Sequence, residues 1–164
     1  MTLNKKVLLF FISFALSSCA LFERKTIYNS PLEYGIESPS KKAAFDLVED
    51  ARELLAENRL DEAKRILEKT ITIDYQNPYS YYFLGVIALL ENKHKKSVGF
   101  FKKSLTLMPS SSFWLSQIYK GLGIAYFNLN MEKTALEHFE KSLKFYSSEK
   151  ESREYIDRIQ NTDH

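Results

Sequence analysis

The chain has 164 residues, with one cysteine, one tryptophan, five glycines and a formal net charge of +2. A hydrophobic fraction of 45% with 27% charged residues excludes a disordered chain, and the low glycine and proline content excludes collagen-like sequence. The single cysteine excludes an internal disulfide framework and a multi-cysteine zinc site, and the small net charge gives no reason to expect nucleic-acid binding.

Residues 1–18 have the organisation of a secretory signal peptide. Lys5 and Lys6 precede ten mostly apolar residues, 7–16, and two serines follow. A basic start, a short apolar stretch and small residues are typical of such a peptide. The apolar run is too short to cross a bilayer, because a spanning helix needs about 20 residues.

The sequence Leu16-Ser17-Ser18-Cys19 resembles the bacterial lipobox, in which a branched apolar residue and two small residues precede a cysteine. The resemblance implies a thioether-linked diacylglycerol on Cys19, cleavage before it, and an N-acyl chain such as palmitate on the new amino terminus. Two or more acyl chains give stable anchoring where one gives only marginal binding. The alternative is a plain secretory peptide cut near Ala20, which would discard Cys19.

The resemblance also implies a location in the bacterial cell envelope. Ala20 stands where an aspartate would favour retention in the inner membrane, so the periplasmic face of the outer membrane is expected. Residues 19–39 contain Pro31, Gly35 and Pro39 and show no helical period, which indicates a lipidated tether. Its fully extended length is roughly 60 Å, at about 3.3 Å per residue.

Three copies of one pattern occupy most of the remaining chain. Ala51, Gly85 and Gly123 align at spacings of 34 and 38 residues. Aligned columns of asparagine, small and large apolar residues follow at Asn58, Asn92 and Asn130; Ala63, Ser97 and Ala135; and Leu67, Phe101 and Phe139. With tyrosines before the two glycines and Pro109 closing the second copy, the pattern resembles the tetratricopeptide repeat (TPR).

The resemblance implies an all-α fold, a right-handed helical-repeat solenoid of about three TPR helix pairs at residues 40–147, followed by a capping helix and tail at 148–164. Helices are expected near Ser40–Glu57, Leu60–Ile73, Pro78–Glu91, His94–Leu107, Leu115–Leu129, Met131–Tyr146 and Glu149–Ile159. The excess of four residues in the second spacing is expected to lengthen the loop at Ser110–Phe113.

Several positions have a local physical reason. Asparagine accepts a left-handed backbone more readily than other non-glycine residues, so the three aligned asparagines are expected to close the first helix of each pair. Small residues in the aligned columns allow close helix approach, and Phe101 and Phe139 are expected to fill the space between successive pairs. Asp50 replaces an apolar residue in the first copy, where no preceding repeat would cover it.

In TPR proteins the first helix of each pair lines a concave groove. Carried over to this sequence, the groove positions are Phe45, Val48, Arg52, Leu55, Tyr79, Tyr82, Val86, Leu89, Gln117, Lys120, Ile124 and Phe127. They are largely apolar and aromatic, and residues 79–90 are apolar almost all round, so this surface is either buried or a binding site. As a binding site it suits a helix or extended peptide of a partner protein. Only Lys120 fits the lysine and asparagine clamp that binds a peptide carboxylate in chaperone-type members, so such a clamp is not expected.

Other occupants of the groove remain open. The tether contains Ile27, Tyr28, Leu32 and Tyr34 and has the composition to fold back into it, and a second copy of the chain is another candidate. A basic run, Lys93, Lys95, Lys96, Lys102 and Lys103, is expected on the convex side. It is interpreted either as a solvated face or as a contact with anionic headgroups.

Residues with catalytic potential are scarce. His94, His138 and His164 lack the spacing of a metal site, and the first two are expected at the surface. The Gly121-x-Gly123 pair lies inside a helical pattern and is interpreted as helix packing, not as a dinucleotide loop. Neither catalytic residues nor a metal or small-molecule cofactor is expected, and the protein is interpreted as a non-enzyme.

Two classes of function follow. The first is a lipid-anchored TPR scaffold or adaptor that binds an envelope protein or peptide segment in its groove during cell-envelope complex assembly. The second is an accessory regulator that recruits a cell-wall-active enzyme to the membrane. The sequence leaves the partner, the envelope machine and the oligomeric state open, and no nucleic acid or small-molecule substrate is expected.

Overall fold

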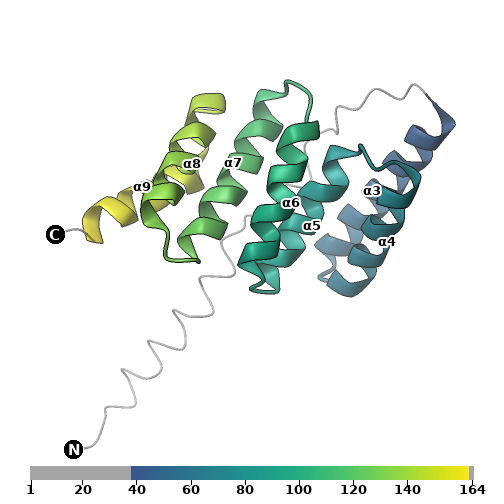
Figure 1. Cartoon of the computed structure of the whole chain (residues 1–164), viewed down its shortest axis with the longest axis horizontal. Helices are drawn as coiled ribbons and strands as arrows, with labels where there is room; N and C mark the ends of the chain where they lie inside the picture. The colour runs from purple at the N-terminus through teal and green to yellow at the C-terminus, as the bar shows by residue number, and fades with distance from the viewer. Residues whose placement is uncertain (1–37, 163–164) are drawn as a thin grey trace, which may run out of the picture. The chain divides into compact units, whose positions relative to one another are not determined.

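The computed structural model describes residues 38–162. The predicted signal peptide and Cys19 lie outside the described residues, as does the tether up to residue 37. The described part consists of seven helices: α3 (Pro39–Ala56), α4 (Leu60–Ile73), α5 (Pro78–Leu90), α6 (His94–Leu107), α7 (Ser112–Phe127), α8 (Glu132–Phe145) and α9 (Lys150–Thr162). The helices follow one another side by side in chain order (Figure 1). The predicted all-α helical-repeat fold is confirmed for this part of the chain.

The helices associate as three pairs. α3 packs mainly on α4, α5 on α6, and α7 on α8, while α4–α5 and α6–α7 contacts join successive pairs. α9 packs mainly on α8. Its buried Ser152 and Ile159 lie on one side of the helix and its exposed charged residues on the other, which is the pattern of a helix covering the end of an array.

The three aligned asparagines end the first helix of each pair as the sequence predicts. Asn58, Asn92 and Asn130 have positive φ angles of 62°, 57° and 57°. Beside each, two hydrogen bonds close the helix end; at the first, Arg59 N donates to Leu54 O (2.9 Å) and Asn58 N donates to Leu55 O (3.1 Å). This is a Schellman motif, and asparagine supplies the left-handed residue that glycine usually supplies.

Glycines on α5 and α7 permit close contacts both within a pair and between successive pairs. A Cβ atom added to Gly85 would lie 2.9 Å from the Phe101 ring, and one added to Gly121 would lie 2.5 Å from the same ring. Phe101 therefore fills the space between the second and third pairs. In the same way a Cβ atom on Gly123 would lie 2.5 Å from Phe139, so the interpretation of Gly121 and Gly123 as packing residues is confirmed.

The prediction of a longer loop at Ser110–Phe113 is wrong. α7 begins at Ser112, and the connections before α5 and α7 both have four residues, 74–77 and 108–111. The extra residues instead extend α7 by a turn at its N-terminus relative to α5. The serines and Phe113 that suggested a loop are compatible with a helix start, where unpaired N–H groups are tolerated.

The seven helices can also be compared with the length and hydropathy that a bilayer requires. None of those described at residues 38–162 is both long enough and apolar enough to cross a membrane. The buried face of each helix packs against the neighbouring helices.

Candidate functional site

The twelve predicted groove positions lie on α3, α5 and α7, the first helices of the three pairs. Ten of them are buried, and only Phe45 on α3 and Phe127 on α7 are half-buried. The sequence left open whether these positions are buried or form a binding surface, and the structure leaves only the two ends of the set accessible. The contacts of these positions differ from pair to pair.

Trp114 contacts the groove positions of the middle pair. It lies in the extra N-terminal turn of α7 and is 1% exposed. Its ring centroid is 5.1 Å from that of Tyr79 and 5.2 Å from that of Tyr82, both in edge-on geometry. Phe83 and Phe101 extend this aromatic cluster through contacts with Trp114 and Tyr82. The turn inserted into the third repeat thus places the Trp114 side chain against α5.

α5 is the helix with the most extensive burial. Every residue from Pro78 to Leu89 is buried except Tyr81. The sequence interpretation, that a helix apolar on almost all sides must be either buried or a binding surface, is resolved here as burial. Tyr81 reaches the surface, where its hydroxyl donates to Tyr75 O (3.1 Å) and Lys103 Nζ lies 5.8 Å from its ring centroid.

Lys120 is held by two carboxylates at the start of α9. Its Nζ atom lies 3.1 Å from Glu149 Oε1 and 3.1 Å from Glu151 Oε2, and its side chain is 3% exposed. Glu149 also accepts a hydrogen bond from Ser152 N (2.7 Å) and so caps α9. Burial raises the pKa of Glu151. The one lysine that fitted a carboxylate clamp therefore binds carboxylates of its own chain.

Two further groove positions, Arg52 and Phe127, also have polar or aromatic contacts within the chain. Arg52 Nη1 donates to both carboxylate oxygens of Glu49, at 2.7 and 2.6 Å, and the arginine side chain is 8% exposed. Phe127 packs edge-on against Tyr155 of α9, at 5.2 Å between ring centroids. Tyr155 also stacks on Phe139, at 4.8 Å. α9 thus contacts the groove positions of the third pair as well as the surface of α8.

The expectation that His138 lies at the surface is wrong. Its ring is half-buried and stacks on Tyr126, with centroids 5.2 Å apart and planes 4° apart, and it also stacks on Tyr119 at 5.9 Å. Burial, together with the nearby Lys141, lowers its pKa to about 4. The imidazole is neutral at neutral pH and acts as an aromatic packing group between α7 and α8.

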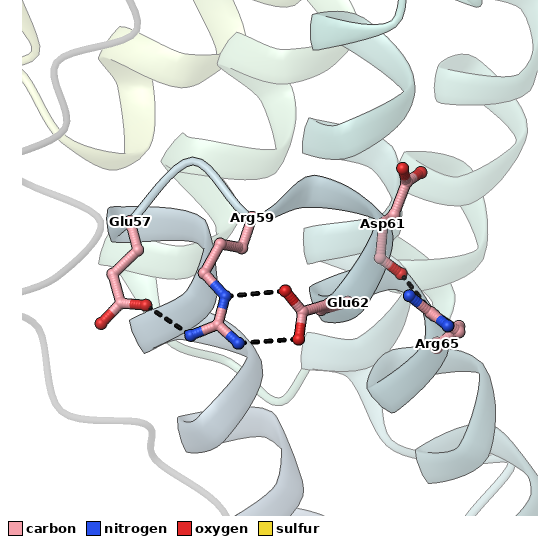
Figure 2. A network of polar contacts seen from close by, with 5 residues as sticks. All are labelled: Glu57, Arg59, Asp61, Glu62 and Arg65. Carbon is pink, nitrogen blue, oxygen red and sulfur yellow. Dashed lines mark hydrogen bonds and ion pairs between the residues drawn. The ribbon is translucent and has the colours of Figure 1, made fainter.

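A polar hollow of about 550 Å³ opens between the first two helices. It is lined by Asp50, Glu53, Leu54, Glu57, Arg59, Glu62, Arg65 and Ile66. Arg59 bridges Glu57 and Glu62, with bonds of 2.7–2.8 Å, and Arg65 donates to the backbone oxygen of Asp61 (Figure 2). The hydrogen bonds that Arg59 donates to Glu62 lower the pKa of this carboxyl group. Asp50 is exposed on α3, the first helix of the array, in agreement with its predicted position on a repeat that no preceding repeat covers.

The described residues form no metal centre. Within residues 38–162, no group of three or more histidine, cysteine or acidic side chains is arranged to hold a metal ion. His94 lies at the start of α6, separate from His138 on α8, so the structure brings neither histidine into a cluster of metal-binding side chains.

The contact residues that sequence reasoning missed are Trp114, Glu149, Glu151 and Tyr155. Their signals were an aromatic residue in the inserted turn and two carboxylates opening the last helix.

Comparisons with known proteins identify the fold. No family model and no curated protein matches the chain. The first TPR domain of Spaghetti (RPAP3), solved with the HSP90 peptide SRMEEVD, is 21% identical, with a TM-score of 0.67 over 78% of this chain and 98% of that one. The Arabidopsis OM64 TPR domain is 15% identical, with a TM-score of 0.68 over 74% of this chain and 98% of that one.

A third structure, YrrB, is described as a TPR protein with an unusual peptide-binding site. It is 18% identical, with a TM-score of 0.63, and the match covers 77% of this chain and 66% of that one. At these identities the comparisons concern the fold. The described part of the chain has the TPR fold, as the repeat pattern predicted.

Proposed function

We propose that this protein is a lipid-anchored TPR scaffold that binds a segment of a partner protein along its first helices during cell-envelope complex assembly. The observation that carries the proposal is the apolar and aromatic character of the groove positions on α3, α5 and α7, whose two ends remain accessible. Phe45 and Phe127 remain half-buried, and a partner segment can cover such apolar side chains. The TPR domain of Spaghetti and YrrB, which are described with peptide ligands or peptide sites, have the same fold.

The accessible ends of the groove define where binding begins. Phe45 and Phe127 are half-buried, whereas the ten positions between them are buried. A partner segment therefore makes its first contacts at these two phenylalanines. Contact with Tyr79 and Tyr82 requires Trp114 to move, and contact with Lys120 requires α9 to move.

The chemistry of the groove indicates the kind of segment that it binds. Lys120 is neutralised by Glu149 and Glu151, so a terminal carboxylate would have to compete with two carboxylates already in place. Tyrosine, phenylalanine and leucine side chains instead favour an apolar or aromatic segment. An amphipathic helix that presents its apolar side to α5 and α7 meets this requirement.

Site-specific photo-crosslinking tests the proposal. A p-benzoylphenylalanine at Phe45 or at Phe127 should capture a defined envelope protein in the cells that produce the chain. The matched control is the same amino acid at Tyr75, which is 66% exposed and is not a groove position. Adducts only within the chain or between its copies would overturn partner binding and support occupation by the tether or by a second copy. Identical adducts from all three sites would show unspecific capture.

The proposed lipid anchor is inferred from the four residues 16–19, so it needs a separate test. Cys19→Ala should leave an uncleaved precursor without lipid, because both modification and cleavage depend on the thiol. Metabolic labelling with an alkyne fatty acid, followed by membrane fractionation, reads out lipid and location together. Normal processing of the variant would contradict lipidation and favour a plain secretory peptide.

The same crosslinking decides between the two classes of function. A scaffold holds structural components of an envelope machine, whereas an accessory regulator contacts an enzyme that acts on the cell wall. Both bind a protein segment and place the same demands on the groove. The identity of the captured protein therefore separates them, with the scaffold as the proposal and the regulator as the alternative.

A further inference from the structure

α6 differs in charge from the two helices that occupy equivalent places. α4 contains Asp61, Glu62 and Glu68, and α8 contains Glu132, Glu137 and Glu140, each balanced by basic residues. α6 has no acidic residue from His94 to Leu107 and contains four lysines, Lys95, Lys96, Lys102 and Lys103. All four are exposed. The basic character predicted for this face is thus concentrated on a single helix.

These four lysines are available for an external contact. Among residues 38–162, no carboxylate lies within ion-pair distance of any of them; Lys93 just before the helix pairs with Glu91 instead, at 2.7 Å. Lys102 Nζ lies 5.7 Å from the Tyr126 ring centroid, and Lys103 Nζ lies 5.8 Å from that of Tyr81. Such contacts are weak when exposed to water and can be exchanged for a carboxylate.

Gly99 lies between the two lysine pairs and is not explained by packing. A Cβ atom on Gly99 would meet nothing within 4 Å, whereas Gly85, Gly121 and Gly123 each face an aromatic ring. The equivalent positions in the other two pairs are Arg65 and Glu137, both exposed. A glycine inside a helix weakens it relative to alanine, so the fold gains nothing from Gly99.

The geometry of this face suits a second helix. Lys95 and Lys96 precede Gly99 by about one turn, and Lys102 and Lys103 follow it by about one turn, so the pairs are roughly 10 Å apart along the axis. A residue without a side chain leaves a depression between them that permits close backbone approach. These five residues, Lys95, Lys96, Gly99, Lys102 and Lys103, are called the α6 saddle below.

We propose that the α6 saddle binds an acidic helix of a partner protein. The partner helix lies along α6 with a small residue over Gly99 and with acidic residues, spaced seven apart, facing each lysine pair. An anionic bilayer would use the lysines but would gain nothing from the missing side chain at Gly99, which favours a protein helix. This surface is distinct from the groove, so the inference does not depend on the proposed function.

The probe for the test is a hydrocarbon-stapled peptide, AAEEAAAAAEEAA, in which two glutamate pairs lie seven residues apart. Binding to the full chain in nonionic detergent is followed by fluorescence anisotropy, and lysine acetylation with mass spectrometry locates the contact. Lys95, Lys96, Lys102 and Lys103 should be protected and Lys133 on α8 should not. Replacing the four glutamates by glutamine should weaken binding at least tenfold.

The variant Gly99→Leu separates a fitted surface from simple charge attraction. It keeps all four lysines, and since its position is open it should fold with an unchanged or raised Tm. We expect at least a tenfold loss of peptide affinity, while the matched variant Glu137→Leu on α8 leaves affinity within twofold. Equal affinity of Gly99→Leu and the unmodified chain would overturn the proposal. So would protection of the lysines by phosphatidylcholine vesicles with 30% phosphatidylglycerol but not by the peptide, which would identify a membrane contact instead.

Discussion

The two helices of the middle pair, α5 and α6, are of nearly equal length but have opposite character. α5 buries eleven of its thirteen residues, whereas α6 buries three of its fourteen, Ser97, Phe101 and Ser104. α5 carries no charged side chain and α6 carries four lysines. In the middle pair, α5 therefore supplies most of the buried residues, whereas α6 contributes Phe101 to the packing and leaves most of its other residues accessible.

The glycines show the same division. Gly85 on α5 and Gly121 on α7 each lie against the Phe101 ring, while Gly99 on α6 faces open space. The same residue type is therefore required by sterics in the first helices and is free of that requirement in the second. Substitutions on the two kinds of helix should differ in sign as well as in size, and four changes test this comparison.

The largest effect is expected at Trp114, which joins the inserted turn of α7 to α5. Trp114→Ala removes a side chain that is 1% exposed and contacts Tyr79, Tyr82 and Phe83. Truncation of a buried aromatic residue should lower the free energy of unfolding by about 3–5 kcal/mol. Urea denaturation of the full chain, followed by circular dichroism, measures the loss. Phe113→Ala, at the half-buried neighbouring position, is the control and should lose clearly less.

A smaller loss is expected at Gly121. Gly121→Ala places a Cβ atom 2.5 Å from the Phe101 ring, which also lies close to Gly85 and so has little room to shift. Overpacking of this kind should lower the free energy of unfolding by about 1–3 kcal/mol, measured as above. An unchanged midpoint would mean that the ring moves freely, and the distinction between the two kinds of glycine would fail.

The lowered pKa of His138, which lies between α7 and α8, predicts that the free energy of unfolding depends on pH. Its folded pKa of about 4 lies below the usual histidine value of about 6.5, so the neutral form is favoured in the folded state. Stability from this group is fully present above pH 6.5 and is lost as the pH falls towards 4. The full shift corresponds to about 3 kcal/mol, and solvent screening at this half-exposed ring reduces the expected loss to about 1–2 kcal/mol.

The variant His138→Phe tests that dependence, because it keeps a ring between Tyr119 and Tyr126 without a titrating group. Tm measured from pH 7.5 to pH 4 should fall less in the variant than in the unmodified chain. Parallel curves for the two proteins would assign the acid sensitivity to other groups.

The smallest effect, opposite in sign, is expected on α6. Gly99→Ala should raise the free energy of unfolding by about 0.5–1 kcal/mol, because alanine favours the helix and its Cβ atom meets nothing within 4 Å. Thermal denaturation should show a small increase in Tm. A decrease would reveal a packing role for Gly99 and remove the contrast with Gly121.

Much of the fold could be predicted from local sequence. The aligned asparagines, glycines and aromatic residues predicted the helix pairs, and the bounds of α4 and α6 match the expected helices at both ends. These features are readable because each depends on contacts within one repeat or with the next one. Asn58, for example, adopts its left-handed conformation through hydrogen bonds that span only six residues.

The candidate site was less predictable. The sequence correctly assigned its twelve positions to the first helices, but it could not decide between burial and a binding surface, and ten of them are buried. It also placed a loop where α7 begins. Helix starts and loops share serine and other polar residues, so composition alone could not tell whether the extra residues lengthen a connection or a helix.

The sequence by itself therefore determined the repeat, its turns and the small residues that permit close packing, since these follow from backbone sterics and short-range hydrogen bonds. Only the tertiary structure decided which surfaces remain open. Trp114 meets Tyr79 across 35 residues of chain, and Lys120 meets Glu149 across 29. Such pairings depend on how whole helices are placed, and exposure is a property of that placement, not of any single segment.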